Sequence, residues 1–263
     1  MYSGWRGRIG HIAPCPVEYE IQEFYQMAPP GVSLVAVTLS VQEIDAKSLD
    51  AALGQPVINA IRDMAGEAVD YIVLAGEPMV FLNGYGSEAR LNKIAAGITS
   101  IPFTHNLPCA VEALRHLGIK KLALATPYSV RDIEGKDVTY ERWRAYLTDA
   151  GFDLVGFATT ALPTNRDVSH LPYFAPYQLA RRAAAEATSP PDGVYMPCAR
   201  WRSPGNIARL ETDLGIPVVT SVQAWTWKAL QVIGIKEASP GFGRLFEGWK
   251  MAEGGPRQGI GPV

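Results

Sequence analysis

The second half of the sequence repeats the pattern of the first half. The segment IPFTHNLPCAVEALRHLGI at 101–119 matches IPVVTSVQAWTWKALQVIGI at 216–235, with one extra residue in the second copy. Upstream of each copy, an Asp begins an apolar run that ends six residues later, DYIVLAG at 70–76 and DGVYMPC at 192–198. The earliest matching runs are RIGHIAP at 8–14 and KLALATP at 121–127. Because three landmarks recur in the same order, the sequence predicts two structurally related halves.

In both halves, short apolar runs alternate with segments of helical periodicity, which is the pattern of parallel βαβ units. The runs expected to form strands, four in each half, are 8–14, 32–40, 70–76, 101–105, 121–127, 153–160, 193–198 and 216–221. The clearest helical segments are 48–68, 110–119, 141–152 and 178–189.

The sequence therefore predicts an α/β fold with two pseudo-symmetric lobes and an active site in the cleft between them. Each lobe has a four-stranded parallel sheet flanked by helices. We expect the first lobe to span 1–119 and the second 120–250, with the last helix able to pack back on the first lobe. The Gly- and Pro-rich segment 251–263 is expected to form a loose tail.

Charge and cysteine content exclude several classes of protein. With 24 Lys and Arg against 26 Asp and Glu, the formal net charge is −2, so no large positive field favours nucleic acid as a partner. No run approaches the roughly 18 apolar residues of a membrane span, and no signal peptide is evident. The cysteines, Cys15, Cys109 and Cys198, lack the spacing of a disulfide framework or a zinc site. We expect a cytoplasmic protein with reduced thiols, and the sequence leaves a homo-oligomer open.

The sequence also lacks the signatures of common cofactor sites. It has no His/Cys/Asp ligand cluster, no GxGxxG after a strand and no P-loop. We therefore expect that neither a metal nor an organic cofactor is needed.

Residues that follow the strands are the candidates for the site. Ligands of open parallel sheets bind beyond the carboxyl ends of the strands, so two facing lobes enclose a site between those ends. The candidate residues are Pro14, Gly76, Glu77, Pro78, Tyr128, Ser129, Cys198, Ala199 and Arg200.

Cys198 carries the most chemical information among these candidates. It closes a strand and precedes a segment that begins like a helix, with Ser203 as a cap and Pro204 in the first turn. The helix start, with Arg200 and Arg202 close in sequence, predicts a lowered pKa for the thiol. The alternative interpretation is a small buried residue at a strand end, which free cysteine often is.

The first half has Gly76 at the position equivalent to Cys198, followed directly by Glu77. Two facing cysteines could remove a proton from one face of a substrate and return it to the other face. With a single thiol, a proton can be added or removed on only one face of the substrate, unless Glu77 supplies a second acid or base.

Several motifs in the second half carry a resemblance to a known family. They are LALATPY (122–128), D-x5-C with LETDLGIPVVTS (210–221) after it, QAWTWKAL (223–230) and PGFGRLF (240–246). With them the chain resembles the cofactor-independent Asp/Glu racemase superfamily, and within it the branch of arylmalonate decarboxylases and maleate cis-trans isomerases. The resemblance covers nearly the whole chain and implies two lobes around a cleft that needs neither metal nor organic cofactor.

The resemblance implies a one-cysteine enzyme. Racemases and isomerases of this kind use a cysteine from each lobe, whereas the decarboxylases keep the second-lobe cysteine and have Gly in the first lobe, as Gly76 and Cys198 do here. We therefore expect a decarboxylase-like enzyme that acts on a small carboxylic acid, such as an aryl- or alkenyl-substituted one. Cys198 would give a proton to a carbanion or enolate, and backbone donors near Gly76 and Ala199, with Tyr128, would stabilise the negative charge.

The residues after Gly76 depart from that pattern and leave alternatives open. Glu77 and Pro78 stand where the decarboxylases have hydroxyl residues that bind a carboxylate. The alternatives are a cis-trans isomerase or racemase that uses Cys198 with Glu77, a Glu77-assisted hydrolase or hydratase, and a non-catalytic ligand-binding protein.

The remaining reactive or aromatic side chains are expected to be structural. Cys15, between two prolines, is favoured as part of a rigid turn over a place in the cleft, and Cys109 is expected to pack in a helix. A structural role is likewise favoured for His11 and His105. Trp201, Trp225 and Trp227 would wall a substrate pocket or fill the core, and the loop 163–178 is equally a lid or a surface excursion.

Overall fold

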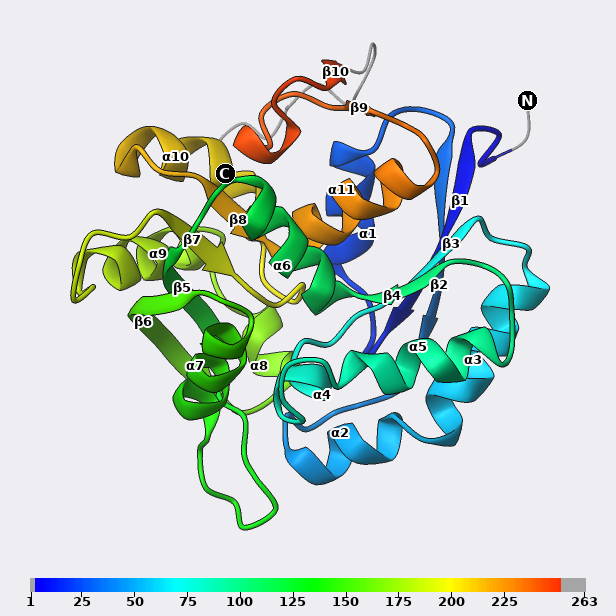
Figure 1. Ribbon diagram of the computed structural model, residues 1–263, viewed down its shortest axis with the longest axis horizontal. Coiled ribbons are helices and arrows are strands. Elements are labelled where there is room, and N and C mark those ends of the chain that lie inside the picture. The colour runs from blue at the N-terminus through cyan, green and yellow to red at the C-terminus, as the bar shows by residue number, and fades with distance from the viewer. Residues whose placement is uncertain (1–2, 252–263) are drawn as a thin grey trace.

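The computed structural model describes residues 3–251 and contains two four-stranded, all-parallel sheets (Figure 1). The strand order is β2-β1-β3-β4 in the first sheet and β6-β5-β7-β8 in the second, so the two sheets have the same topology. The strands are β1 (Gly7–Ala13), β2 (Val32–Thr38), β3 (Tyr71–Leu74), β4 (Phe103–His105), β5 (Lys121–Tyr128), β6 (Asp153–Leu162), β7 (Gly193–Met196) and β8 (Val218–Thr220). The predicted fold class is confirmed. We call the parts built around these sheets the first and second lobes.

The internal repeat is visible in the hydrogen bonds that start each sheet. The Asp70 carboxylate accepts from the backbone N–H of Arg8 at 2.8 Å, and the Asp192 carboxylate accepts from that of Lys121 at 2.8 Å. Each lobe thus uses the Asp before its third strand to hold the beginning of its first strand, which explains why this residue recurs in both halves.

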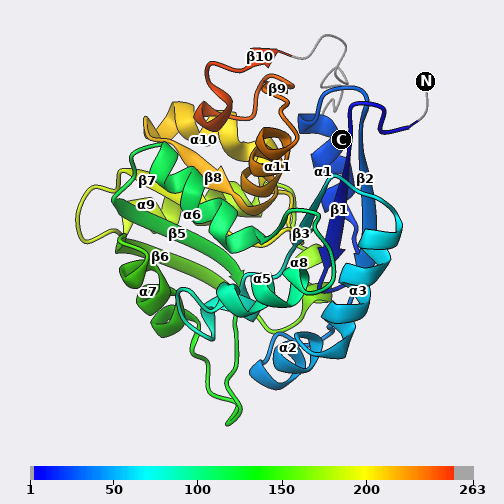
Figure 2. The ribbon, with the colours of Figure 1, turned by 45° about the vertical axis from the view of Figure 1, so that its right-hand side comes forward.

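Helices cover the sheets and join the lobes. They are α1 (Tyr19–Met27), α2 (Ala46–Ala52), α3 (Gln55–Gly66), α4 (Pro78–Phe81), α5 (Glu88–Ala96), α6 (Asn106–His116), α7 (Thr139–Asp149), α8 (Asn165–Ser169), α9 (Ala175–Ala185), α10 (Ile207–Leu214) and α11 (Ser221–Val232). The equivalent helices α6 and α11 pack against each other between the two sheets, and Figures 1 and 2 show them side by side. At their first residues, the amide Nδ2 of Asn106 donates to the Ser221 hydroxyl at 3.0 Å. The last long helix, α11, also packs on α1 of the first lobe.

Three local features differ from the expectations. The helical segment 48–68 is two helices, α2 and α3, because Gly54 and Pro56 break it and Pro56 suits the first turn of the second helix. The segment 237–251 adds a short pair of strands, β9 (Glu237–Ala238) and β10 (Lys250–Met251), which has no counterpart in the first half. The expected tail lies outside the described residues except for Met251. No helix within residues 3–251 is long and apolar enough to cross a membrane.

Candidate active site

The candidate site lies at the switch point of each sheet, where the connections leave the first strand in opposite directions. A cavity with about 500 Å³ of empty space, part of it open to solvent, lies there. Its lining residues are Pro14, Cys15, Glu20, Val41, Ile44, Leu49, Ala75, Gly76, Glu77, Pro78, Asn106, Tyr128, Asn165, Cys198, Ala199 and Arg200. All candidates named from the sequence line this cavity except Ser129. Its backbone N–H donates to Leu162 O of β6 at 2.9 Å, so Ser129 continues the pairing of β5 with β6 by one residue.

The backbone repeats at the two residues that face the cavity from equivalent positions. Gly76 has φ +111° and Cys198 has φ +78°, so both lie in the region that L-residues rarely adopt. A Cβ on Gly76 would lie 2.9 Å from Met79 Sδ and 3.3 Å from Pro14 Cγ. A side chain at this position would therefore require the Met79 side chain to shift, and of these two equivalent positions only the one on the second lobe carries a thiol. A non-glycine residue held at positive φ is typical of a functional site.

The predicted lowering of the pKa of Cys198 is wrong. Burial raises the pKa of the thiol well above its ordinary value, and the Glu77 carboxylate raises it further. The backbone N–H of Arg200, 3.4 Å from Sγ, opposes this shift only in part. Arg202 lies over the ring of Tyr19 at 4.3 Å instead of beside the sulfur. The thiol is therefore protonated at neutral pH and suited to donate a proton.

The turn after Cys198 also differs from the expected helix start. A 3₁₀ turn, η1 (Pro204–Asn206), precedes α10, and the side chain of Ser203 makes no capping hydrogen bond. The start of α10 therefore lies nine residues after Cys198, too far to act on the thiol through its dipole.

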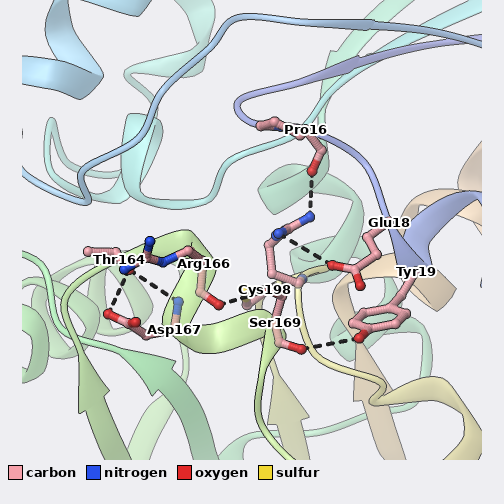
Figure 3. A network of polar contacts seen from close by, with 9 residues as sticks. Pro16, Glu18, Tyr19, Thr164, Arg166, Asp167, Ser169 and Cys198 are labelled. Atoms are coloured by element: carbon pink, nitrogen blue, oxygen red, sulfur yellow. Dashed lines mark hydrogen bonds and ion pairs between the residues drawn. The ribbon is translucent and has the colours of Figure 1, made fainter.

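Arg200 ties the loop after Cys198 to the first lobe. Its guanidinium donates to Pro16 O and lies 3.6 Å from the Glu18 carboxylate. Figure 3 shows the contacts of the guanidinium with Pro16 and Glu18, and also the Tyr19 hydroxyl donating to Ser169 O. The positive charge of Arg200 is thus already engaged by first-lobe groups.

Glu77 crosses from the first lobe to the second. It is 3% exposed, and its Oε1 accepts from the Tyr195 hydroxyl at 3.3 Å. Burial raises the pKa of Glu77, while hydrogen bonds from the Ser221 hydroxyl and the backbone N–H of Cys198 oppose that shift. A carboxyl group with a raised pKa therefore lies next to the thiol, where it can accept or donate a proton.

Tyr128 lies in the wall beside this pair. Its side chain lines the cavity and its hydroxyl is buried. Burial raises the pKa of the phenol well above its ordinary value, and the nearby Glu77 and Cys198 raise it further. The phenol therefore keeps its proton and is a donor at neutral pH.

Segments from both lobes close the cavity on its apolar side. Ile44 N–H donates to Pro163 O at 3.4 Å, and Asn165 Nδ2 donates to Val41 O at 3.3 Å. The loop 163–178 contains α8 and the start of α9, and it contributes Asn165 to the cavity. Sequence reasoning missed Ile44, Leu49 and Asn165, which lie in a loop, in α2 and at the first residue of α8, because an isolated apolar or amide side chain there is no signal for a site.

Glu20 is a further cavity residue that sequence reasoning missed, although a signal existed. The buried residues of α1 are Glu20, Glu23, Phe24 and Met27, which share one helical face. Two glutamates on the apolar stripe of an amphipathic helix indicate carboxyl groups that point inward.

The other cysteines differ in their position. Cys15 lines the cavity, and burial, together with Glu20, raises its pKa to about 12. Cys109 is buried in α6, with Sγ 4.0 Å from the Tyr71 hydroxyl, and it is not among the lining residues. Cys198 therefore differs from Cys15 and Cys109 in standing at a strand end with a positive φ and next to Glu77.

The histidines and tryptophans named from the sequence lie behind the cavity wall. Burial lowers the pKa of His105 to about 3, and its Nδ1 accepts from Leu107 N–H at 3.2 Å. Its Nε2 therefore carries the proton and donates to Gly76 O at 3.2 Å, which holds the glycine turn. Buried residues that do not line the cavity are His11, Trp201, Trp225 and Trp227. Within the described part of the chain, no group of three or more His, Cys, Asp or Glu is arranged to hold a metal ion.

Comparison with known families shows to which family the chain belongs. A family model described as arylmalonate decarboxylase matches residues 9–246. The chain belongs to the arylmalonate decarboxylase family. The resemblance to this branch of the Asp/Glu racemase superfamily, expected from the sequence motifs, is thereby confirmed.

Members of this family and its neighbours include both a decarboxylase and isomerases. Arylmalonate decarboxylase of Bordetella bronchiseptica is 26% identical over 219 residues, covering 83% of this chain and 88% of that protein. Maleate isomerase of Nocardia farcinica is 25% identical over 249 residues, covering 91% and 95%. A crystal structure of a liganded double mutant of arylmalonate decarboxylase has a TM-score of 0.81 at 25% identity, covering 92% of this chain and 99% of that chain. The chain is an enzyme of the arylmalonate decarboxylase family.

Proposed function

We propose that the protein is a cofactor-independent decarboxylase of a small malonate-type acid, with Cys198 as the proton donor. The observation that carries this proposal is the asymmetry of the cavity. The protonated thiol of Cys198 stands on the second lobe, whereas the equivalent first-lobe position is Gly76, with the side chains of Met79 and Pro14 close to its Cα. At this pair of equivalent positions the thiol of Cys198 is the one acid, which suits a reaction that adds one proton to one face of a carbanion.

The proposed reaction has two steps. The bond between the α-carbon and one carboxylate breaks, CO2 leaves, and the electron pair spreads into the remaining carboxylate as an enediolate. Backbone N–H groups near Gly76 and Ala199, with the Tyr128 phenol, stabilise the developing charge. Cys198 Sγ then transfers its proton to the α-carbon, and solvent returns a proton to the thiolate.

A cis-trans isomerase or racemase is the second candidate, and Glu77 favours it. The carboxyl group of Glu77 is buried next to Cys198 and has a raised pKa, so it could serve as a second acid or base. In that reaction Cys198 would act as a nucleophile or base, and it would first have to lose its proton, against the effects of burial and of Glu77.

Replacing Glu77 with Gln separates the two candidates. For the decarboxylase we expect kcat/KM within about tenfold of wild type, because the amide keeps the size of the side chain and Cys198 remains the acid. The pH–rate profile should also keep its shape. The measurement is kcat/KM against pH for wild type and Glu77→Gln, with Glu112→Gln as a surface control, since Glu112 is a half-exposed partner of Lys228.

A loss of about 10²–10⁴-fold, with one limb of the profile missing in Glu77→Gln, would contradict the decarboxylase proposal. That result would assign the second acid or base to Glu77 and favour the isomerase.

A further inference from the structure

The carboxyl groups of the cavity outnumber its cations. Glu20 and Glu77 both line it and each is 3% exposed, whereas Arg200 is the only basic residue in the lining. Pro16 O and the Glu18 carboxylate already engage the guanidinium of Arg200, as Figure 3 shows. A ligand with two negative charges would therefore meet like charges in a poorly solvated site.

Glu20 has the features of an unfilled binding group. Its side chain makes no hydrogen bond within residues 3–251, and its Oε2 lies 3.5 Å from His11 Nε2, a contact that is an ion pair only when the imidazole is protonated. The His11 ring is stacked on Trp225 at 4.9 Å, so packing holds it in place. A largely buried carboxyl group that lines the cavity and accepts no hydrogen bond within the described residues can accept one from a ligand there.

The position of Glu20 also places it close to the reacting groups. Glu20 lines the same cavity as Cys15, Glu77 and Cys198, and its charge contributes to raising the pKa of all three. Glu20 is in the first turn of α1, where the helix dipole stabilises a negative charge. The apolar wall of Val41, Ile44 and Leu49 is left for a hydrocarbon substituent.

We infer that Glu20 binds a protonated amine of the ligand, so that the ligand is a small amino-substituted carboxylic acid with an apolar side group. This inference deepens the proposed function. It rests on that function in one respect, namely that the ligand of this cavity is a small carboxylic acid. For the decarboxylase the substrate is then an aminomalonate-type acid, and the product is an amino acid.

Isosteric ligand pairs test the inference through binding alone. In phenylglycine against 2-phenylpropionate, and in alanine against isobutyrate, an ammonium group replaces a methyl group of similar size. By titration calorimetry on the full chain, we expect wild type to prefer the amino member of at least one pair. Glu20→Gln should weaken binding of that amino acid by about 10- to 100-fold and leave its methyl partner unchanged or tighter.

Glu23→Gln is the matched control, because Glu23 lies on the same buried face of α1 but does not line the cavity. It should keep the preference for the amino member. Equal binding within both pairs, an amino-acid affinity unaffected by Glu20→Gln, or no binding of either amino acid at millimolar concentration would overturn the inference.

Turnover of aminomalonate and methylmalonate separates this inference from the proposed reaction. If the amino acids bind through Glu20 but neither malonate loses CO2, the ligand class stands and decarboxylation is wrong. If methylmalonate is decarboxylated and aminomalonate is not, decarboxylation stands and the ligand class is wrong.

Discussion

Replacing Cys198 with Ser should lower the rate of decarboxylation by about 10²–10⁴-fold while the protein stays folded. Serine has nearly the size of cysteine, but its hydroxyl is a far weaker acid than a thiol. Because the pKa of Cys198 is raised, the thiol is protonated at neutral pH and begins to lose its proton only in alkaline solution. The activity of wild type should therefore persist to higher pH than an ordinary thiol would allow, and kcat/KM against pH measures both effects.

Cys109→Ala is the control for that substitution. Cys109 is buried to the same degree but lies in α6 outside the cavity lining, so its removal should leave kcat/KM near the wild-type value. Undiminished turnover by Cys198→Ser would show that another group protonates the intermediate.

Replacing Trp143 with Ala should lower the free energy of unfolding by about 3–5 kcal/mol. Trp143 is fully buried on α7 of the second lobe, and its ring packs on Phe81 of α4 with centroids 4.3 Å apart. It also meets the Tyr195 ring edge-on at 6.0 Å, and Tyr195 in turn donates to Glu77. The substitution thus leaves a cavity where the lobes meet, which the surrounding side chains cannot fill.

Urea unfolding followed by fluorescence and circular dichroism measures the loss. Trp5→Ala is the matched control, because the Trp5 side chain is 48% exposed and its loss should cost about 0.5 kcal/mol or less. A Trp143→Ala variant as stable as Trp5→Ala would show that the two lobes do not depend on this contact.

The repeat made most of the fold predictable from the sequence. Asp70 and Asp192 recur because both fix the start of a first strand by the same hydrogen bond. The match of Gly76 with Cys198 likewise holds at the level of the backbone, since both have positive φ. Such features depend on the spacing of residues along the chain within each half, which can be seen directly in the sequence.

The errors concern directions of side chains, which local spacing does not determine. Arg200 is two residues from Cys198, but its guanidinium turns to Pro16 and Glu18, so burial and Glu77 dominate the pKa of the thiol. Ser129 follows β5 and continues its pairing with β6 through its backbone, and it is not among the residues that line the cavity. Both outcomes depend on contacts between segments far apart in the chain.

Glu20 is an intermediate case. The apolar pattern of α1 is a sequence signal that the carboxyl group of Glu20 points inward. Only the folded chain shows that α1 brings this group to the cavity formed by Gly76 and Cys198.

Turnover in deuterated water tests one-sided protonation by Cys198 most directly. The protein is incubated with methyl-, phenyl-, alkenyl- and aminomalonate derivatives and with maleate, and the products are followed by NMR. We expect at least one malonate to lose CO2 and to give a product with a single deuterium at the α-carbon in one configuration, without later exchange. Isomerisation of maleate, or deuterium exchange into a monocarboxylic acid from both faces, with no loss of CO2 from any malonate, would contradict the account.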